Sequence, residues 1–201
     1  MPRTAGSRGA RTAAAIRRAG LKLIARHGFA AMNLRELAAE VGIQPGSLYN
    51  HIETKQALLF DLIREHLDSL LASTEAALSA APPDPLAQLR AFAAHHVLYH
   101  LEKRQEVYIA NFELRALDAA NYGRIIILRQ AYEARLTALL EAGDQAGELT
   151  VADPPVTAFA LLAMLTGVCT WYRPGGRLSK ATLVALHTEL ALSGIRRRAS
   201  G

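Results

Sequence analysis

The stretch LRELAAEVGIQPGSLYNHIETKQALL, residues 34–59, decides the fold, because glycine and proline interrupt a helical pattern at defined places. The apolar residues of its first part recur at the spacing of one helix face: Leu34, Leu37, Ala38 and Val41. Asn33 is a favourable N-cap and Glu36 follows at capping-box spacing, while Gly42 stands where a helix commonly ends. The sequence therefore predicts a short helix between Asn33 and Gly42.

A second short helix begins almost at once. Pro45 suits a first helical turn, where its missing N–H loses no hydrogen bond. Leu48, Tyr49 and Ile52 again have helical spacing, and Thr54 is placed to cap a longer helix after it. A helix whose first residues are small and polar can enter the major groove of DNA, where base edges carry sequence information.

The stretch resembles the helix-turn-helix signature of the tetracycline-repressor-like (TetR) family of transcriptional regulators. The resemblance covers about residues 12–60. It is carried by Ile16, Ala19, Gly28, Phe29, Leu37, Ala38, Val41, Gly42, Gly46, Leu48, Tyr49, His51, Lys55 and Leu58. Ile52 departs from the phenylalanine that the family often has after the histidine, but the position stays apolar.

The resemblance implies which residues contact DNA. The set comprises the start of one helix, most of the next and the beginning of a third: Asn33, Arg35, Gln44, Pro45, Gly46, Ser47, Tyr49, Asn50, His51 and Lys55. Arg35 can bond guanine in a bidentate way, and Gln44 and Asn50 can read a base edge, whereas Tyr49 and Lys55 suit the phosphate backbone. Two alternatives stay open: Arg35 as a surface ion-pair partner, and His51 as a buttress of the turn.

Charge is distributed unevenly along the 201 residues. The first 35 residues contain eight Lys or Arg and no Asp or Glu, although the whole chain has 23 basic and 18 acidic residues. Such asymmetry indicates a polyanionic partner, either nucleic acid or a membrane surface. A solvated tail or an Arg-rich transit peptide is the alternative. We expect a mobile basic tail over residues 1–11 and no secretory signal.

The rest of the chain also has helical patterns, and no segment shows the sustained alternation of apolar and polar residues that is typical of a strand. An all-α fold of about nine helices is predicted, with an N-terminal three-helix DNA-binding domain over residues 12–55. Residues 56–201 then form a ligand-binding and dimerisation domain. The later helices are expected over about 85–102, 104–116, 118–143, 155–173 and 179–197.

Two histidines lie on one apolar helix face, because Leu89, Ala93, His96 and His100 follow one another at helical spacing. The pair could chelate a metal, be satisfied core side chains, or orient a ligand, and no third metal ligand stands at a telling spacing. We expect no metal or cofactor. The predicted effector site comprises His96, His100, Tyr108, Asn111, Phe112, Arg115, Trp171 and Arg173.

Two segments in the C-terminal part of the chain bear on how it assembles and which effector it binds. The helix containing residues 158–172 is apolar nearly all round, which predicts burial on two sides in a homodimer. That 15-residue run is short for a membrane span. The segment WYRPGGRLS, residues 171–179, resembles the family branch that senses acyl-CoA esters.

The sequence therefore predicts a cytoplasmic, ligand-responsive repressor that binds a near-palindromic DNA operator as a homodimer. An enzyme is disfavoured because no set of nucleophile, base and carboxylate is evident. A membrane-surface protein is disfavoured because the first helix is mostly alanine between its arginines. Cys169 is expected to be a buried small hydrophobe rather than a nucleophile.

Overall fold

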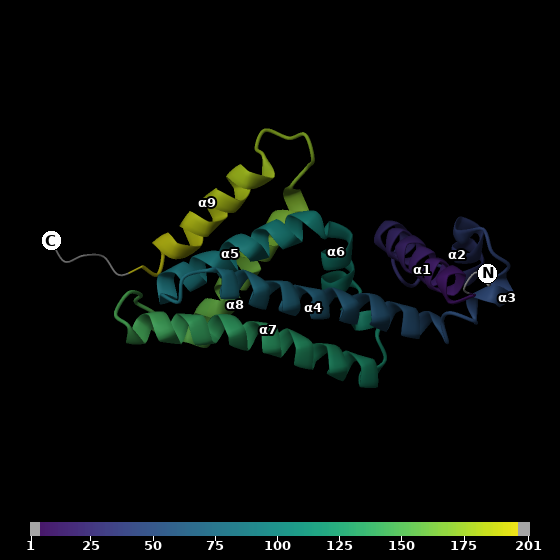
Figure 1. The fold of residues 1–201 in the computed structure, drawn as a ribbon, viewed down its shortest axis with the longest axis horizontal. Helices are drawn as coiled ribbons and strands as arrows, with labels where there is room; N and C mark the ends of the chain where they lie inside the picture. Colours follow the sequence, from purple (N-terminus) through teal and green to yellow (C-terminus); the bar gives the residue numbers. More distant parts are fainter. Residues whose placement is uncertain (1–4, 197–201) are drawn as a thin grey trace. The chain divides into compact units, whose positions relative to one another are not determined.

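The computed structural model describes residues 5–196, which form nine α-helices and one 3₁₀ turn, with no strand in that range (Figure 1). An isolated bridge joins Leu149 to Arg196. The elements are α1 Ala5–His27, α2 Leu34–Val41, α3 Pro45–Leu48, α4 Lys55–Ala80, α5 Pro85–Glu102, α6 Arg104–Phe112, η1 Leu114–Ala116, α7 Ala119–Gln145, α8 Pro154–Trp171 and α9 Lys180–Ser193. The predicted all-α class with about nine helices is confirmed.

The chain divides into two compact units. The first contains Met1–His66 and Gln105–Ile126, and the second contains Leu67–Arg104 and Ile127–Gly201. Both α4 and α7 begin in the first unit and end in the second. The functional boundary expected between residues 55 and 56 is a different division and stays a prediction.

Side-chain caps begin several helices as the sequence predicts. Asn33 Oδ1 accepts from the Glu36 N–H at 2.8 Å, and Thr54 Oγ1 accepts from the Ala57 N–H at 2.9 Å. Asp84 and Ser179 accept in the same way at the starts of α5 and α9. Each such cap contributes about 1 kcal/mol, because it satisfies a backbone donor that the helix leaves unpaired.

The core of the first unit is built from the apolar faces that the sequence shows. Ile16 and Ile24 of α1, Leu37 of α2, Leu48 of α3 and Leu58 of α4 are all at most 1% exposed. Because these side chains come from four helices, they hold α2 and α3 in one fixed arrangement.

The returning segment Gln105–Ile126 is attached to this core by specific contacts. The Gln56 side-chain N–H donates to the Ala116 carbonyl at 2.7 Å, and the Arg124 guanidinium lies 4.4 Å from the Phe60 ring centroid. The first unit is therefore more than the helix-turn-helix alone.

In the second unit, α5 packs against both α8 and α9. Buried residues lie all round α5, including Phe92, Val97 and Leu101 as well as the two histidines. This explains why α5 has apolar residues on more than one face.

Four local expectations are wrong. The first helix begins at Ala5, inside the tail expected over residues 1–11, because a helix already nucleated in the alanine-rich part extends through Gly9 and Ala10. The regular α3 ends at Leu48 instead of reaching Ile52, and the chain continues in turns. The helix expected over 104–116 ends at Phe112 and is followed by η1. Cys169 is half-buried, and its thiol donates to the Thr166 carbonyl at 2.9 Å.

The helix α8 is less covered than its sequence suggests. Its 18 residues have a mean hydropathy of 1.4, which by length and composition is enough to cross a membrane. One face is buried, formed by Ala158, Leu161, Leu165 and Val168. The opposite face is open within one chain, so the expected burial on two sides needs a further partner.

Candidate DNA-binding surface and effector site

A tight glycine turn sets the angle between α2 and α3. Gly42 adopts φ 75° and ψ 35°, a left-handed conformation that glycine tolerates best, and its N–H donates to the carbonyls of Ala38 and Ala39. The Ile43 N–H then bonds to the Ala38 carbonyl at 3.0 Å. The chain is thus turned within three residues, and α3 begins at Pro45 as predicted.

The short α3 has one buried side and one polar side. Leu48 is fully buried and anchors the helix, whereas Tyr49 is 61% exposed. Among the predicted DNA contacts of this segment, Ser47 is half-buried. The others are exposed: Gln44, Pro45, Gly46, Tyr49, Asn50 and His51. The fold therefore leaves these groups open to solvent around the buried Leu48.

At the start of α2, Arg35 lies exposed beside the cap residue Asn33. Within residues 5–196 the Arg35 guanidinium has no ion-pair partner, so a surface ion pair does not account for it. Asn33 uses Oδ1 for the cap, which leaves its amide N–H groups to donate elsewhere. His51 is exposed and makes no side-chain hydrogen bond in that range, which argues against a buttress. Contacts of all three with DNA stay predictions.

Lys55 has an intramolecular role that the sequence does not reveal. Its Nζ donates to the Ala30 carbonyl at 3.1 Å and lies 4.5 Å from the Phe29 ring centroid. The side chain therefore fastens the start of α4 to the connection between α1 and α2. An ammonium has three donors, so a phosphate could still accept one of them.

In the second unit, His96 joins three helices through its ring. Its Nδ1 lies 2.9 Å from the Tyr132 hydroxyl on α7, and its Nε2 lies 3.0 Å from the Thr166 hydroxyl on α8. Because both nitrogens already have partners, chelation would break one of these bonds. No group of three metal-binding side chains occurs in the described part of the chain.

His100 stacks on His96, with ring centroids 3.7 Å apart. Its Nδ1–H donates to the His96 carbonyl at 2.7 Å, which leaves Nε2 as a hydrogen-bond acceptor. Burial lowers the pKa of His100 from 6.5 to about 4, so the ring is neutral at physiological pH. The two rings therefore form a buried polar cluster in which His100 is neutral.

The sequence prediction missed the partners of this cluster. Tyr132 and Thr166 lie 36 and 70 residues from His96, so no local spacing links them to it. Burial also raises the pKa of Tyr132 above its ordinary value, which keeps its hydroxyl protonated.

The other predicted effector residues are exposed. On α6, the rings of Tyr108 and Phe112 have centroids 4.8 Å apart, and Asn111 donates from its side chain to the Val107 carbonyl at 2.9 Å. Together with Arg115, these residues belong to the first compact unit. His96, His100, Trp171 and Arg173 belong to the second. One site lined by all eight therefore stays a prediction.

Cations gather at one end of the second unit, where α5 and α8 end and α9 begins. The Arg104 guanidinium donates to the Cys169 carbonyl at 3.4 Å and lies 5.7 Å from the Tyr172 ring centroid. The exposed Trp171 stacks on His187 with centroids 5.8 Å apart. Further basic residues of this end are Lys103, Arg173, Arg177 and Lys180. Sequence reasoning identified Trp171 and Arg173 but missed the contribution of Arg104 from α5.

Comparison with protein families gives one match over the helix-turn-helix region and another over the later helices. Residues 16–62 match the family model for bacterial regulatory proteins of the tetR family, and residues 82–195 match the model of the tetracyclin repressor-like C-terminal domain. The second match alone covers more than half of the chain. The chain belongs to the TetR family. It is a transcriptional regulator and not an enzyme, as the sequence predicts.

Relatives and solved structures support this membership over nearly the whole chain. The HTH-type transcriptional repressor KstR2 of Rhodococcus jostii is 27% identical over 175 residues, covering 86% of this chain and 85% of that protein. A tetR-family regulatory protein from Rhodococcus RHA1 superposes with a TM-score of 0.86 at 28% identity, covering 94% of this chain and 98% of that one. The structure of AibR in complex with isovaleryl coenzyme A and operator DNA gives a TM-score of 0.82 at 25% identity, covering 89% and 97%.

Proposed function

We propose that this TetR-family regulator is a cytoplasmic repressor that binds a near-palindromic operator as a homodimer and leaves it when a small effector binds. The observation that carries the proposal is the exposed polar surface of α3, held in place by the buried Leu48 and the Gly42 turn. A palindromic operator follows from a two-fold dimer, because each protomer then meets an equivalent half-site.

The proposed DNA contacts divide by chemistry. Arg35 reads a guanine edge, and Gln44 and Asn50 offer amide groups to bases in the major groove. Tyr49 and Lys55 bind phosphates, which positions α3 without specifying sequence. The exposed state of Arg35 and Tyr49 supports this division, because neither side chain is needed by the fold.

The proposed dimer uses the open faces of α8 and α9. Away from the cationic end, their exposed large apolar side chains are Val156, Phe159, Leu186 and Leu190. An exposed apolar patch on a soluble protein commonly marks a protein interface. Two copies related by a two-fold axis would pack these faces against each other as a four-helix interface.

The proposed effector is bulky and largely apolar, and an acyl-CoA ester fits the available chemistry. The basic side chains at the cationic end of the second unit can bind phosphates, and Trp171 offers an aromatic face beside them. The similarity to AibR, whose structure contains isovaleryl coenzyme A, supports this class. The neutral ring of His100, whose Nε2 is left as an acceptor, would orient the polar part of the acyl group, and His96 would hold that ring by stacking on it.

The test of the effector class is a DNA-release titration with matched pairs of free acids and their CoA esters, covering several chain lengths and ring types. We expect CoA esters to release the operator at much lower concentrations than the corresponding acids. Equal potency within every pair, or no release by any compound, would remove the acyl-CoA proposal. The DNA-binding proposal would stand, because it depends on other residues.

A further inference from the structure

One buried hydrogen-bond acceptor of the second unit has no donor within the described residues 5–196. The His100 Nδ1–H donates to the His96 carbonyl at 2.7 Å, so the lone pair of the neutral ring lies on Nε2. No hydrogen bond reaches Nε2 from that part of the chain. An acceptor that is buried without a donor costs free energy, which a ligand with a donor would recover.

The protein fixes which nitrogen of His100 is the acceptor. A proton moved from Nδ1 to Nε2 would leave the Nδ1 lone pair facing the His96 carbonyl oxygen, only 2.7 Å away. Burial also keeps a second proton off the ring, because it lowers the pKa of His100 to about 4. At physiological pH, Nε2 therefore accepts a hydrogen bond and cannot donate one.

His96 holds this ring in place but cannot act in its stead. The two rings stack with centroids 3.7 Å apart. His96 Nδ1 lies 2.9 Å from the Tyr132 hydroxyl, and its Nε2 lies 3.0 Å from the Thr166 hydroxyl. Because the fold uses both nitrogens of His96, only His100 of this pair offers an acceptor to a ligand.

The acceptor is not sealed off from its surroundings. His100 is 4% exposed, and Nε2 does not belong to the fully enclosed side-chain atoms that lack a partner. The space beside Nε2 therefore admits a group about the size of a water molecule. A hydroxyl has that size and donates without a charge, whereas an ammonium would lose its hydration on burial. A ketone or thioester oxygen only accepts and would face Nε2 lone pair to lone pair.

We propose that His100 Nε2 accepts a hydrogen bond from a hydroxyl group on the acyl part of the effector. The regulator then responds to hydroxylated acyl-CoA esters in preference to the matching ketone or unsubstituted esters. The inference rests on the proposed function and narrows its effector to one chemical class. His96 is a positioning residue in this account, because it acts through the ring that it holds.

The test is release of a fluorescent operator duplex, followed by anisotropy, with triplets of CoA esters that share one carbon skeleton. The members of a triplet have a hydroxyl, a ketone or a methylene at one position, and the triplets place that position at several points of chains and rings. In at least one triplet, the hydroxyl ester should release DNA from the wild type at about tenfold lower concentration than the ketone ester. Tenfold is the factor that a hydrogen bond of about 1.4 kcal/mol gives.

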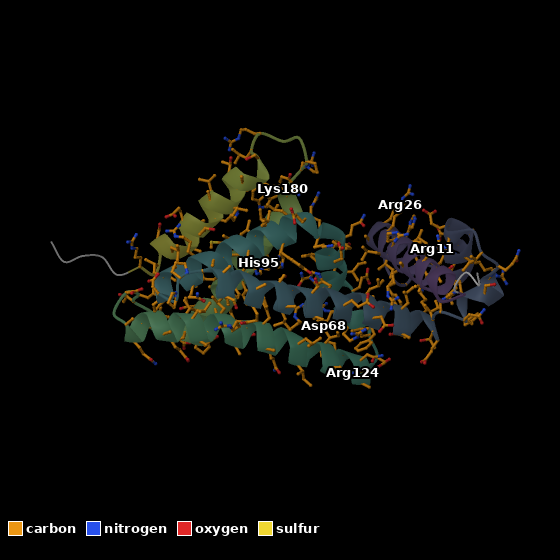
Figure 2. All side chains as sticks on the ribbon, in the orientation of Figure 1. Arg11, Arg26, Asp68, His95, Arg124 and Lys180 are labelled. Atoms are coloured by element: carbon orange, nitrogen blue, oxygen red, sulfur yellow. The ribbon has the colours of Figure 1, made fainter. Side chains whose placement is uncertain are left out.

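Substitutions at His100 assign this preference to Nε2. His100→Phe keeps a ring against His96 without the acceptor, so the hydroxyl and ketone esters should become equally potent. His100→Gln offers an amide N–H as well as an oxygen, so it should gain response to the ketone ester. The matched control is His95→Phe on the same helix (Figure 2), where the half-buried ring lies 3.2 Å from the Thr74 hydroxyl. That variant should keep the tenfold preference.

The outcomes separate this inference from the proposed function. Equal potency of hydroxyl and ketone esters in every triplet would overturn the inference, while release itself would leave the acyl-CoA proposal intact. A preference that His100→Phe retains, or that His95→Phe also loses, would assign it to another group. Equal weakening of all esters by His100→Phe would place the donor on the pantetheine arm and overturn the hydroxyl assignment. Release by no ester would overturn the acyl-CoA proposal and the inference with it, and selective operator binding would stand.

Discussion

Acid should destabilise the protein measurably through His100. Its imidazole is buried and its pKa falls from 6.5 to about 4 on folding, because burial disfavours the charged ring. Above pH 6.5 the ring is neutral in both states and has no effect. Between pH 6.5 and pH 4 the unfolded chain takes up a proton that the native protein does not, so the free energy of unfolding falls as pH falls.

The size of this loss follows from the shift. A pKa difference of 2.5 at about 1.36 kcal/mol per unit gives a full loss of about 3–4 kcal/mol, of which about 3 kcal/mol has appeared by pH 4. About 2 kcal/mol of it should appear by pH 5. His100→Phe keeps a ring against His96 and removes the titrating group. It costs about 1 kcal/mol for the lost hydrogen bond, but that cost does not depend on pH.

Urea denaturation followed by far-ultraviolet circular dichroism at pH 7, 6 and 5 measures the effect. Protein concentration is held constant, because assembly makes apparent stability depend on it. Wild type should lose about 2 kcal/mol more than His100→Phe between pH 7 and pH 5, and the exposed-site control His51→Ala should behave as wild type. If wild type and His100→Phe lose the same free energy, the burial argument is wrong.

Three further outcomes are expected. Gly143→Ala should lower the free energy of unfolding by about 1–3 kcal/mol in urea denaturation, because an added Cβ would lie 2.4 Å from Leu149 Cδ1. The control is Gly123→Ala on the same helix, where an added Cβ meets nothing within 4 Å. That substitution should be neutral or slightly stabilising. Leu186→Glu should yield monomers in light scattering and lose operator affinity, since a buried unpaired charge costs several kcal/mol; a monomeric wild type would refute the interface. Lys55→Ala should weaken all duplexes about equally, and a change in base preference would show that Lys55 does more than bind backbone.

The helix-turn-helix was predictable because its signals are local. Asn33, Gly42, Pro45 and Thr54 act on backbone groups within four residues of themselves, so their spacing in the sequence predicts the structure directly. The α1 boundary was missed because helix extension through Gly9 depends on the alanine-rich turns that follow.

The candidate effector residues were less predictable because their surroundings come from distant segments. The spacing of His96 and His100 shows one shared face, but it does not show that Tyr132 and Thr166 satisfy both nitrogens of His96. The same holds for Arg17 and Arg18, which differ only because Glu65 of α4 lies beside one of them. Exposure and pairing of this kind depend on packing between helices.

Selection of binding sequences from a random duplex pool tests the central claim most directly. The wild-type protein, free of effector, should enrich a near-palindrome whose half-sites are about one helical turn, ~34–36 Å, apart or at a related spacing. Arg35→Ala should enrich the same palindrome with one position relaxed, at a cost of about 1–3 kcal/mol in affinity. Failure of the wild type to enrich any sequence over the starting pool, at low and at physiological salt, would contradict the account.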